Sequence, residues 1–308
     1  MTQTTIAPPP AALEQEHAAL RRAIARTVAY ADLFDYPLDT DQVHRYLIGE
    51  NATRDEVSAM LERDAALGGT VESTDGRFHL RGRASVVETR RTREAASAEL
   101  WRRARRYGAW VSRVPLVRFV GVTGALAMSN AERGADVDLF ILTHPGRVWL
   151  CRLLVLGVVR VAAMRGDRLC PNFLLSTERL TLRERNLFTA HEIAQMVPLH
   201  PTEWYARFMD ANAWVLDFLP NATSARVAPA RAGVLSRAAT WLLSRGPFAV
   251  LERWEMRRKI RRLNARAARE GGSLSFSEVE CRGHFAAHDV RVLAAYADRV
   301  ALVEQQLK

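Results

Sequence analysis

The sequence has few cysteines and almost no lysine. Its 308 residues include three cysteines, Cys151, Cys170 and Cys281, which are too few and too scattered for a disulfide framework. Only Lys259 and Lys308 are lysines, so the net charge of +10 comes from arginine. A GC-rich genome would produce this bias, together with the abundant alanine, without any anionic partner. Charge alone therefore neither establishes nor excludes binding to nucleic acid.

The sequence also lacks a recognisable targeting or membrane-spanning segment. Residues 1–17 have no basic start followed by an apolar run, so they are typical of a disordered tail and not of a secretory signal. The most apolar window, Val148 to Met164, is interrupted by Arg152 and Arg160 and is short for a bilayer span. It predicts a buried helix with arginines at its edge, and we expect a cytoplasmic protein.

Residues 18–83 are predicted to form a winged-helix-like module. Three helical patterns precede two short alternating segments around Asp75-Gly76, which is a strong hairpin signal. In a winged helix that binds DNA, the third helix enters the major groove. Here that helix, at about 53–67, has a net negative charge, which disfavours contact with phosphates. A protein-contact or lid role is therefore favoured.

The sequence also predicts two arginine-rich helices. One is a connecting helix at residues 84–113, and the other, at residues 253–269, lies in a predicted C-terminal helical domain at 201–308. Both are candidates for binding nucleic acid, and the second also for an anionic membrane surface. The alternative for each is a docked helix with a solvated basic side.

The region 114–200 changes to a strand, turn, helix, strand pattern. Asp136 and Asp138 stand two apart in an apolar strand, so they are expected to project from the same face. Two carboxylates this close repel each other unless a cation lies between them, and hard oxygen ligands favour Mg²⁺ or Mn²⁺. Gly124 opens a short helix upstream, whose N-terminus is expected to seat a phosphate.

The stretch "VTGALAMSNAERGADVDLFIL", from Val122 to Leu142, resembles the signature of the nucleotidyltransferase superfamily typified by DNA polymerase beta and the aminoglycoside nucleotidyltransferases. That signature is an apolar strand, Gly-Ser, a variable segment and Asp-x-Asp in a second strand. The segments "LFDYPL" and "FTAHEIAQMVPL" resemble a group of largely uncharacterised bacterial nucleotidyltransferase-domain proteins. The resemblance implies an α/β (α+β) nucleotidyltransferase core with a mixed sheet.

The resemblance also implies roles for single residues. Asp136 and Asp138 would hold two metal ions, one bridging the triphosphate of an NTP and one activating an acceptor hydroxyl. The nucleotide would lie against four residues at the start of the short helix and just beyond it. These are Thr123, Gly124, Ala125 and Ser129.

Two positions depart from the family pattern. The serine that usually follows the glycine is Ala125, although the Thr123 hydroxyl is close in sequence. The third carboxylate, usually on the next strand, is absent, and Asn172 takes a plausible position for it. Asp167 lies just before that strand. An asparagine can give one oxygen to a metal but cannot act as a base.

Two functions remain open at this point. The first is metal-dependent transfer of a nucleoside monophosphate from an NTP to the hydroxyl of an unidentified acceptor, which would be a small molecule, a protein or a nucleic acid. The alternative is a catalytically degenerate protein of the same fold, acting as a nucleotide-binding or DNA/protein-binding regulatory module.

Histidine motifs offer two weaker hypotheses. The first is a zinc site, because the spacing of Cys281, His284 and His288 is seen among zinc ligands. The alternative is that these residues form the polar start of a helix that packs over the core. His191 and Glu192 match half of a metalloprotease helix, but the second histidine is absent. We therefore expect His191 at the surface or near a helix cap.

Overall fold

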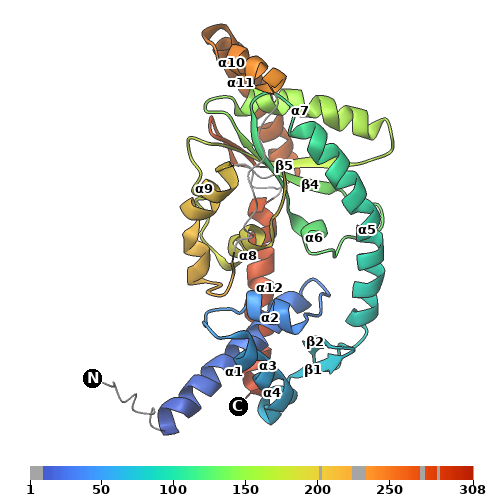
Figure 1. Cartoon of the computed structure of the whole chain (residues 1–308), viewed down its shortest axis with the longest axis vertical. Helices are drawn as coiled ribbons and strands as arrows, with labels where there is room; N and C mark the ends of the chain where they lie inside the picture. The colour runs from blue at the N-terminus through green and yellow to red at the C-terminus, as the bar shows by residue number, and fades with distance from the viewer. Residues whose placement is uncertain (1–9, 201–202, 224–233, 271–274, 283–284, 308) are drawn as a thin grey trace, which may run out of the picture. The chain divides into compact units, whose positions relative to one another are not determined.

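The computed structural model describes residues 10–200, 203–223, 234–270, 275–282 and 285–307 (Figure 1). The chain divides into two compact units. Unit 1 comprises residues 1–90, 216–223 and 293–308, and unit 2 comprises residues 91–215 and 224–292. Residues of the region 201–308, predicted as a C-terminal helical domain, thus fall in both units.

Unit 1 begins with helices and continues into a hairpin. Asp39 and Thr53 each start a helix with a reciprocal capping box. The predicted hairpin is confirmed, and Asp75 and Gly76 both have positive φ, as its tight turn requires. The first helix begins at Pro10, so residues 10–17 are helical and the expected tail is shorter. These elements are α1 (Pro10–Asp32), α2 (Thr40–Arg45), α3 (Arg54–Arg63), α4 (Ala65–Gly68), β1 (Val71–Thr74) and β2 (Arg77–Leu80).

The C-terminal end of the chain completes unit 1. Asp32 of α1 is buried, and its carboxylate accepts hydrogen bonds from Arg83 (3.0 Å) and from Arg299. The rings of Tyr30 and Tyr296 meet edge to face with centroids 5.4 Å apart. Unit 1 therefore unites residues from opposite ends of the sequence.

Unit 2 is built on a mixed sheet, which in the described residues has the strand order β6-β3-β4-β5-β8-β7. β4 and β5 are parallel, and all other neighbouring strands are antiparallel. The three strands predicted from the sequence are confirmed, and three shorter ones appear where helix or irregular chain was expected. The strands are β3 (Val117–Val122), β4 (Val137–Thr143), β5 (Leu169–Ser176), β6 (Val197–His200), β7 (Ser275–Phe276) and β8 (Glu280–Arg282).

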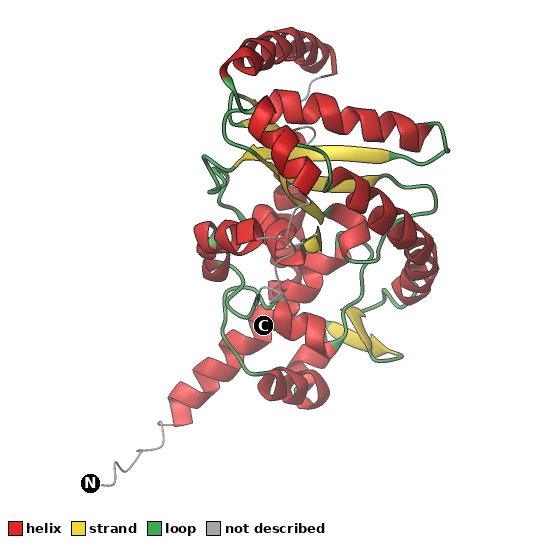
Figure 2. Cartoon of the chain, turned by 45° about the horizontal axis from the view of Figure 1, so that its top comes forward, coloured by secondary structure: helices red, strands yellow, loops and turns green. Residues whose placement is uncertain are grey.

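Helices cover both faces of this sheet (Figure 2). The connecting helix and the predicted buried helix are confirmed, and in the second Trp149, Cys151 and Val155 are fully buried. No helix in the described segments combines the length and apolar composition needed to cross a bilayer. The remaining helices are α5 (Val86–Val111), α6 (Gly124–Ala127), α7 (Val148–Ala163), α8 (Leu187–Gln195), α9 (Glu203–Ala211), the 3₁₀ turn Ala213–Asp217, α10 (Val234–Leu243), α11 (Gly246–Glu270) and α12 (Phe285–Gln306).

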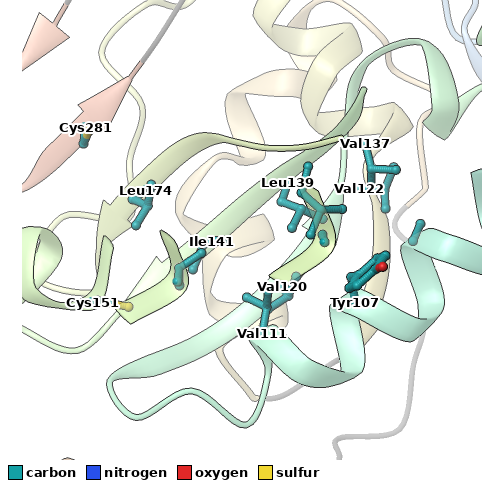
Figure 3. Close-up of a cluster of buried hydrophobic side chains, with 14 of the residues drawn as sticks. Tyr107, Val111, Val120, Val122, Val137, Leu139, Ile141, Cys151, Leu174 and Cys281 are labelled. Carbon is teal, nitrogen blue, oxygen red and sulfur yellow. The ribbon is translucent and has the colours of Figure 1, made fainter. Parts of the chain in front are cut away.

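The alternation of residues along β4 sorts them between two cores. Leu139 and Ile141 point toward Tyr107 and Val111 of α5, in the cluster that also receives α7 (Figure 3). Phe140, between them, points to the opposite face, where its ring meets those of Phe119, Phe173 and Phe208. Asp138 is two residues before Phe140, so the period of the strand places it on this second face.

Candidate active site

The two aspartates at the start of β4 have different surroundings. Asp136 directly precedes the strand; its side chain is 48% exposed, and Arg168 Nε lies 2.7 Å from its Oδ1. Asp138 is the second residue of the strand and is partly buried. The structure therefore places one carboxylate at the surface, in an ion pair, and the other at the edge of the core.

Gly124 makes room for the Asp138 carboxylate. A Cβ atom on Gly124 would lie only 2.9 Å from Asp138 Oδ2, and the backbone has φ +68°, which favours glycine. The backbone N–H of Thr123 also donates to the Asp138 carbonyl, at 3.2 Å. The glycine chosen from the sequence and the second aspartate are thus in direct contact.

Glu192 belongs to the same cluster. It comes from α8, and its carboxylate accepts a hydrogen bond from the backbone N–H of Gly124. The pKa of Glu192 is raised to about 7. Burial is the main cause and the negative charge of Asp138 adds to it, while the Gly124 N–H and the charge of Arg282 partly offset the rise. The site thus contains a carboxyl that titrates near neutral pH.

In the sequence, Glu192 stands out only as half of a metalloprotease pattern. The available signal was an acidic residue within the apolar helical segment "LFTAHEIAQ". That signal could not show which strand the helix would face. The structure supplies the missing partner, because α8 contacts α6, which starts at Gly124.

Cys170 lies beside Asp138 across the parallel pair of β4 and β5. Burial, together with the charges of Asp138 and Asp136, raises the pKa of the Cys170 thiol to about 12. The thiol is therefore protonated at neutral pH and hydrogen-bonds the Asp138 side chain. It acts as a donor that holds the carboxylate and not as a nucleophile.

Asn172 follows on β5, where the register shifts between the pairs Asp138–Cys170 and Phe140–Phe173. Its Oδ1 is buried and has no hydrogen-bond partner among the described residues. A buried amide oxygen without a partner is costly, and a cation is one way to satisfy it. The predicted role of Asn172 as a metal ligand is compatible with this state, and it remains a prediction.

The other predicted nucleotide contacts have mixed surroundings. Thr123 is buried and starts α6 without a side-chain cap, whereas Ala125 is exposed. Ser129 Oγ accepts a hydrogen bond from Trp101 Nε1 at 3.2 Å. The structure thus fixes the Ser129 hydroxyl on α5.

Asp167 is held by α5. Tyr107 Oη donates to its Oδ2 at 2.6 Å, and Arg103 forms an ion pair with its Oδ1 at 2.9 Å. Burial and this hydrogen bond both raise the pKa of Tyr107. Asp167 is thus already satisfied by two partners, and it is a weaker candidate than Glu192 for the third carboxylate.

The histidine hypotheses gain no support from the described residues. His191 is only 3% exposed, its Nδ1 lies 2.9 Å from the Leu187 carbonyl oxygen, and burial lowers its pKa to about 4. The expectation of a surface or cap position was therefore wrong, because the helix turns this side chain into the core. Cys281 is buried in β8 and His288 is exposed, while His284 lies outside the described residues.

The donors at the start of β4 suit a hard cation. Asp136 and Asp138 offer carboxylate oxygens, and Mg²⁺ is often bound by one or two carboxylates together with substrate phosphates. Within the described residues, no group of three or more His, Cys, Asp or Glu side chains is placed to hold a metal ion alone. Asp136 and Asp138 would therefore supply only part of the ligand set of such an ion.

Comparison with protein-family models, with curated proteins and with solved structures returned no match. What this site does is therefore inferred from its own residues.

Proposed function

We propose that this chain is a metal-dependent nucleotidyltransferase that moves a nucleoside monophosphate from an NTP to an acceptor hydroxyl. The cluster of Asp138, Glu192 and Gly124 carries the proposal. The carboxylates of Asp138 and Glu192 are both partly buried, and the charge of Asp138 raises the pKa of Glu192. Their repulsion destabilises the fold unless a bound proton or cation neutralises part of the charge. A site that keeps both is suited to a cation and to proton transfer.

Asp136 and Asp138 would hold the metal, with Asn172 Oδ1 as an additional oxygen. A bound divalent cation would neutralise charge on the triphosphate. Asp136 would exchange its ion pair with Arg168 for this role. Because both side chains of that pair are largely exposed, the exchange requires little energy.

Glu192 would supply the base that Asn172 cannot. In the proposed reaction the acceptor oxygen attacks the α-phosphorus, and the bond from that phosphorus to the bridging oxygen breaks. Pyrophosphate leaves with the electron pair, and the hydroxyl proton passes to Glu192. A carboxyl with a pKa of about 7 is well matched to accept a proton near neutral pH.

Two contacts favour the alternative, a binding module without catalysis. Arg168 is paired with Asp136, and Glu192 occupies the Gly124 N–H that would face a phosphate. If these contacts persist when nucleotide is present, the acidic cluster is a structural feature. The chain would then act as a nucleotide-binding or DNA/protein-binding regulatory module.

Binding of nucleotide tests the site. We expect at least one of the four NTPs to raise the melting temperature in the presence of Mg²⁺ or Mn²⁺, because a ligand bound only to the native state stabilises it, by about 2.7 kcal/mol at a hundredfold excess over Kd. The shift should vanish in Asp136→Asn/Asp138→Asn. It should persist in Glu132→Gln/Asp210→Asn, which makes the same charge change at two exposed positions of unit 2.

The outcomes separate the two functions. A metal-dependent shift, together with pyrophosphate release that Glu192→Gln abolishes while nucleotide binding persists, supports the transferase. A shift that needs neither metal nor the aspartates supports the binding module. If no NTP shifts the melting of well-folded protein, both nucleotide proposals are wrong.

A further inference from the structure

The end of α10 and the start of α11 expose a group of large apolar side chains. In soluble proteins such side chains are usually scattered singly, and a concentration of them marks a binding surface. Here each is more than half exposed, and all fall within a short length of chain. They are Trp241 (61%), Leu242 (53%), Val250 (61%) and Trp254 (56%).

This segment is anchored firmly to unit 2. The backbone N–H of Leu116 donates to Thr240 Oγ1 at 3.0 Å, and Arg147 donates to the carbonyls of Leu243 (3.0 Å) and Ser244 (2.8 Å). Glu252 of α11 accepts hydrogen bonds from the start of α7. The exposure of the tryptophans therefore does not arise from fraying.

The spacing along α11 separates an inner face from an outer one. Phe248, Leu251, Met256 and Ile260 pack against the core cluster of unit 2. Val250, Trp254, Arg257 and Arg261 are exposed, and their spacings of four, three and four residues place them along one side of a helix. The outer face of α11 is thus apolar over its first turns and basic beyond them.

The exposed charges of this segment all have the same sign. Its two acidic residues, Glu252 and Glu255, are buried. Arg245 stacks over Trp241, with its guanidinium carbon 3.9 Å from the ring centroid, and Arg258 stacks over Trp254 at 5.2 Å. The exposed charged side chains between residues 234 and 262 are Arg237, Arg245, Arg253, Arg257, Arg261 and Arg262.

We propose that this α10–α11 surface, defined by Trp241, Leu242, Val250, Trp254 and the exposed arginines named above, binds to a bilayer that contains anionic lipids. Tryptophan favours the depth of the headgroups, and a helix with an apolar side flanked by arginine lies in the plane of the interface. The arginines would meet the lipid phosphates. The proposal does not depend on the nucleotide site.

Two other occupants fit less well. A symmetric contact with a second copy would bring like-charged arginines together. A nucleic acid would use aromatic rings for stacking, but each indole already has a guanidinium over its ring, and Leu242 and Val250 would have no role. An anionic bilayer uses both the charge and the aliphatic side chains.

Vesicle co-sedimentation of the full chain tests the proposal. We expect binding to vesicles of phosphatidylcholine mixed with phosphatidylglycerol, little binding to phosphatidylcholine alone, and weakening with added salt. Arg257→Gln/Arg261→Gln should lower the partition coefficient about fivefold for each arginine removed. Trp241→Ala/Trp254→Ala should lower it as well.

Matched variants make the result specific. Arg102→Gln/Arg106→Gln removes two exposed arginines from α5, and Met164→Ala removes the exposed Met164 side chain of unit 2. Both should bind vesicles nearly as well as the unmodified chain. Equal losses in these controls would mean that vesicle binding arises from overall charge or from non-specific hydrophobic adsorption, and they would overturn the proposal.

The other occupants give distinct readouts. Dimerisation in sedimentation velocity that Trp241→Ala/Trp254→Ala abolishes, without vesicle binding, would assign the surface to a second copy. Binding of a single-stranded RNA that depends on these tryptophans, without vesicle binding, would assign it to nucleic acid. Either result contradicts the proposal, as does a well-folded chain that binds no anionic vesicles.

Discussion

Glu192 and Gly124 show how single residues define the candidate site. Glycine is needed at position 124 for two reasons. The backbone has a positive φ, and a Cβ atom would lie too close to an Asp138 carboxylate oxygen. Glu192 combines a burial cost with a neighbouring negative charge, so its protonation is linked to folding. Gly124 could be chosen from the sequence because the turn and the Asp-x-Asp pattern are local. Glu192 could not, since its partners lie more than fifty residues away along the chain.

The pH dependence of stability tests the state of Glu192. Its pKa is about 7 in the folded chain against an ordinary value of 4.5, so the folded state holds a proton that the unfolded state releases. The contribution of Glu192 to the free energy of unfolding should therefore fall as the pH rises from about 4.5 to about 7, by at most about 3 kcal/mol, against the opposite contribution of buried His191, whose pKa is lowered. Glu192→Gln should remove this decline, as measured by urea unfolding across that range.

Glu132→Gln is the control for that experiment, because it removes an exposed carboxylate of the same unit. It should leave the pH profile unchanged. An unchanged profile in Glu192→Gln would mean that Glu192 is hydrated and titrates normally, and the proposed base would lose its physical basis.

Helix α7 shows how an element depends on partners outside itself. Arg147 at its N-terminal boundary makes no side-chain cap. Instead, the Glu252 carboxylate of α11 accepts from the backbone N–H groups of Trp149 (2.8 Å) and Leu150 (2.7 Å), which a helix start leaves without partners. Burial raises the pKa of Glu252, and these hydrogen bonds oppose the rise. The apolar pattern predicted the helix, but the cap comes from a distant helix.

Removal of this cap should destabilise unit 2. We expect Glu252→Ala to lower the free energy of unfolding by about 2 kcal/mol, because two buried N–H groups lose their acceptor. Arg253→Ala, at the adjacent exposed position, should change it by less than about 0.5 kcal/mol. Urea unfolding at neutral pH measures both, and equal effects would contradict the capping role.

Strands β6, β7 and β8 also depend on partners outside themselves. They have four, two and three residues, and none shows an alternating pattern long enough to predict a strand. Each exists because another strand offers unpaired backbone groups: β6 pairs with β3, β8 with β5, and β7 with β8. Short strands of this kind follow from tertiary pairing and not from propensity.

The whole chain is organised by contacts between distant segments. Unit 1 gathers three separate pieces, and its buried Asp32 is bonded to Arg83 and to Arg299 near the C-terminus. A buried carboxylate that loses a cationic partner is strongly destabilising. Residues near both ends of the sequence therefore support the same unit.

Arg299→Ala should lower the stability of unit 1 and leave that of unit 2 unchanged. Because a chain with two units need not unfold in one step, hydrogen exchange of individual amides is the suitable measurement. We expect faster exchange in α1, corresponding to about 1–3 kcal/mol, with little change in the sheet of unit 2. Asp298→Ala, at an exposed neighbouring position, should leave both unchanged. Equal exchange in the two variants would show that Arg83 alone satisfies Asp32.

The sequence by itself determined the local elements of this protein. Apolar runs specified β3, β4, β5 and α7, turn residues specified the hairpin at Asp75-Gly76, and the Asp-x-Asp spacing located the acidic edge of β4. These features could be predicted because their causes, namely side-chain period, capping and turn conformation, act over a few residues.

Only the tertiary structure decided which distant residues meet. It brought Glu192 to Gly124, placed Glu252 at the start of α7, buried His191, and divided the C-terminal region between two units. Each of these outcomes depends on packing between segments far apart in the chain. No local pattern encodes such packing, because a buried group gains its partner from whichever element the fold brings against it.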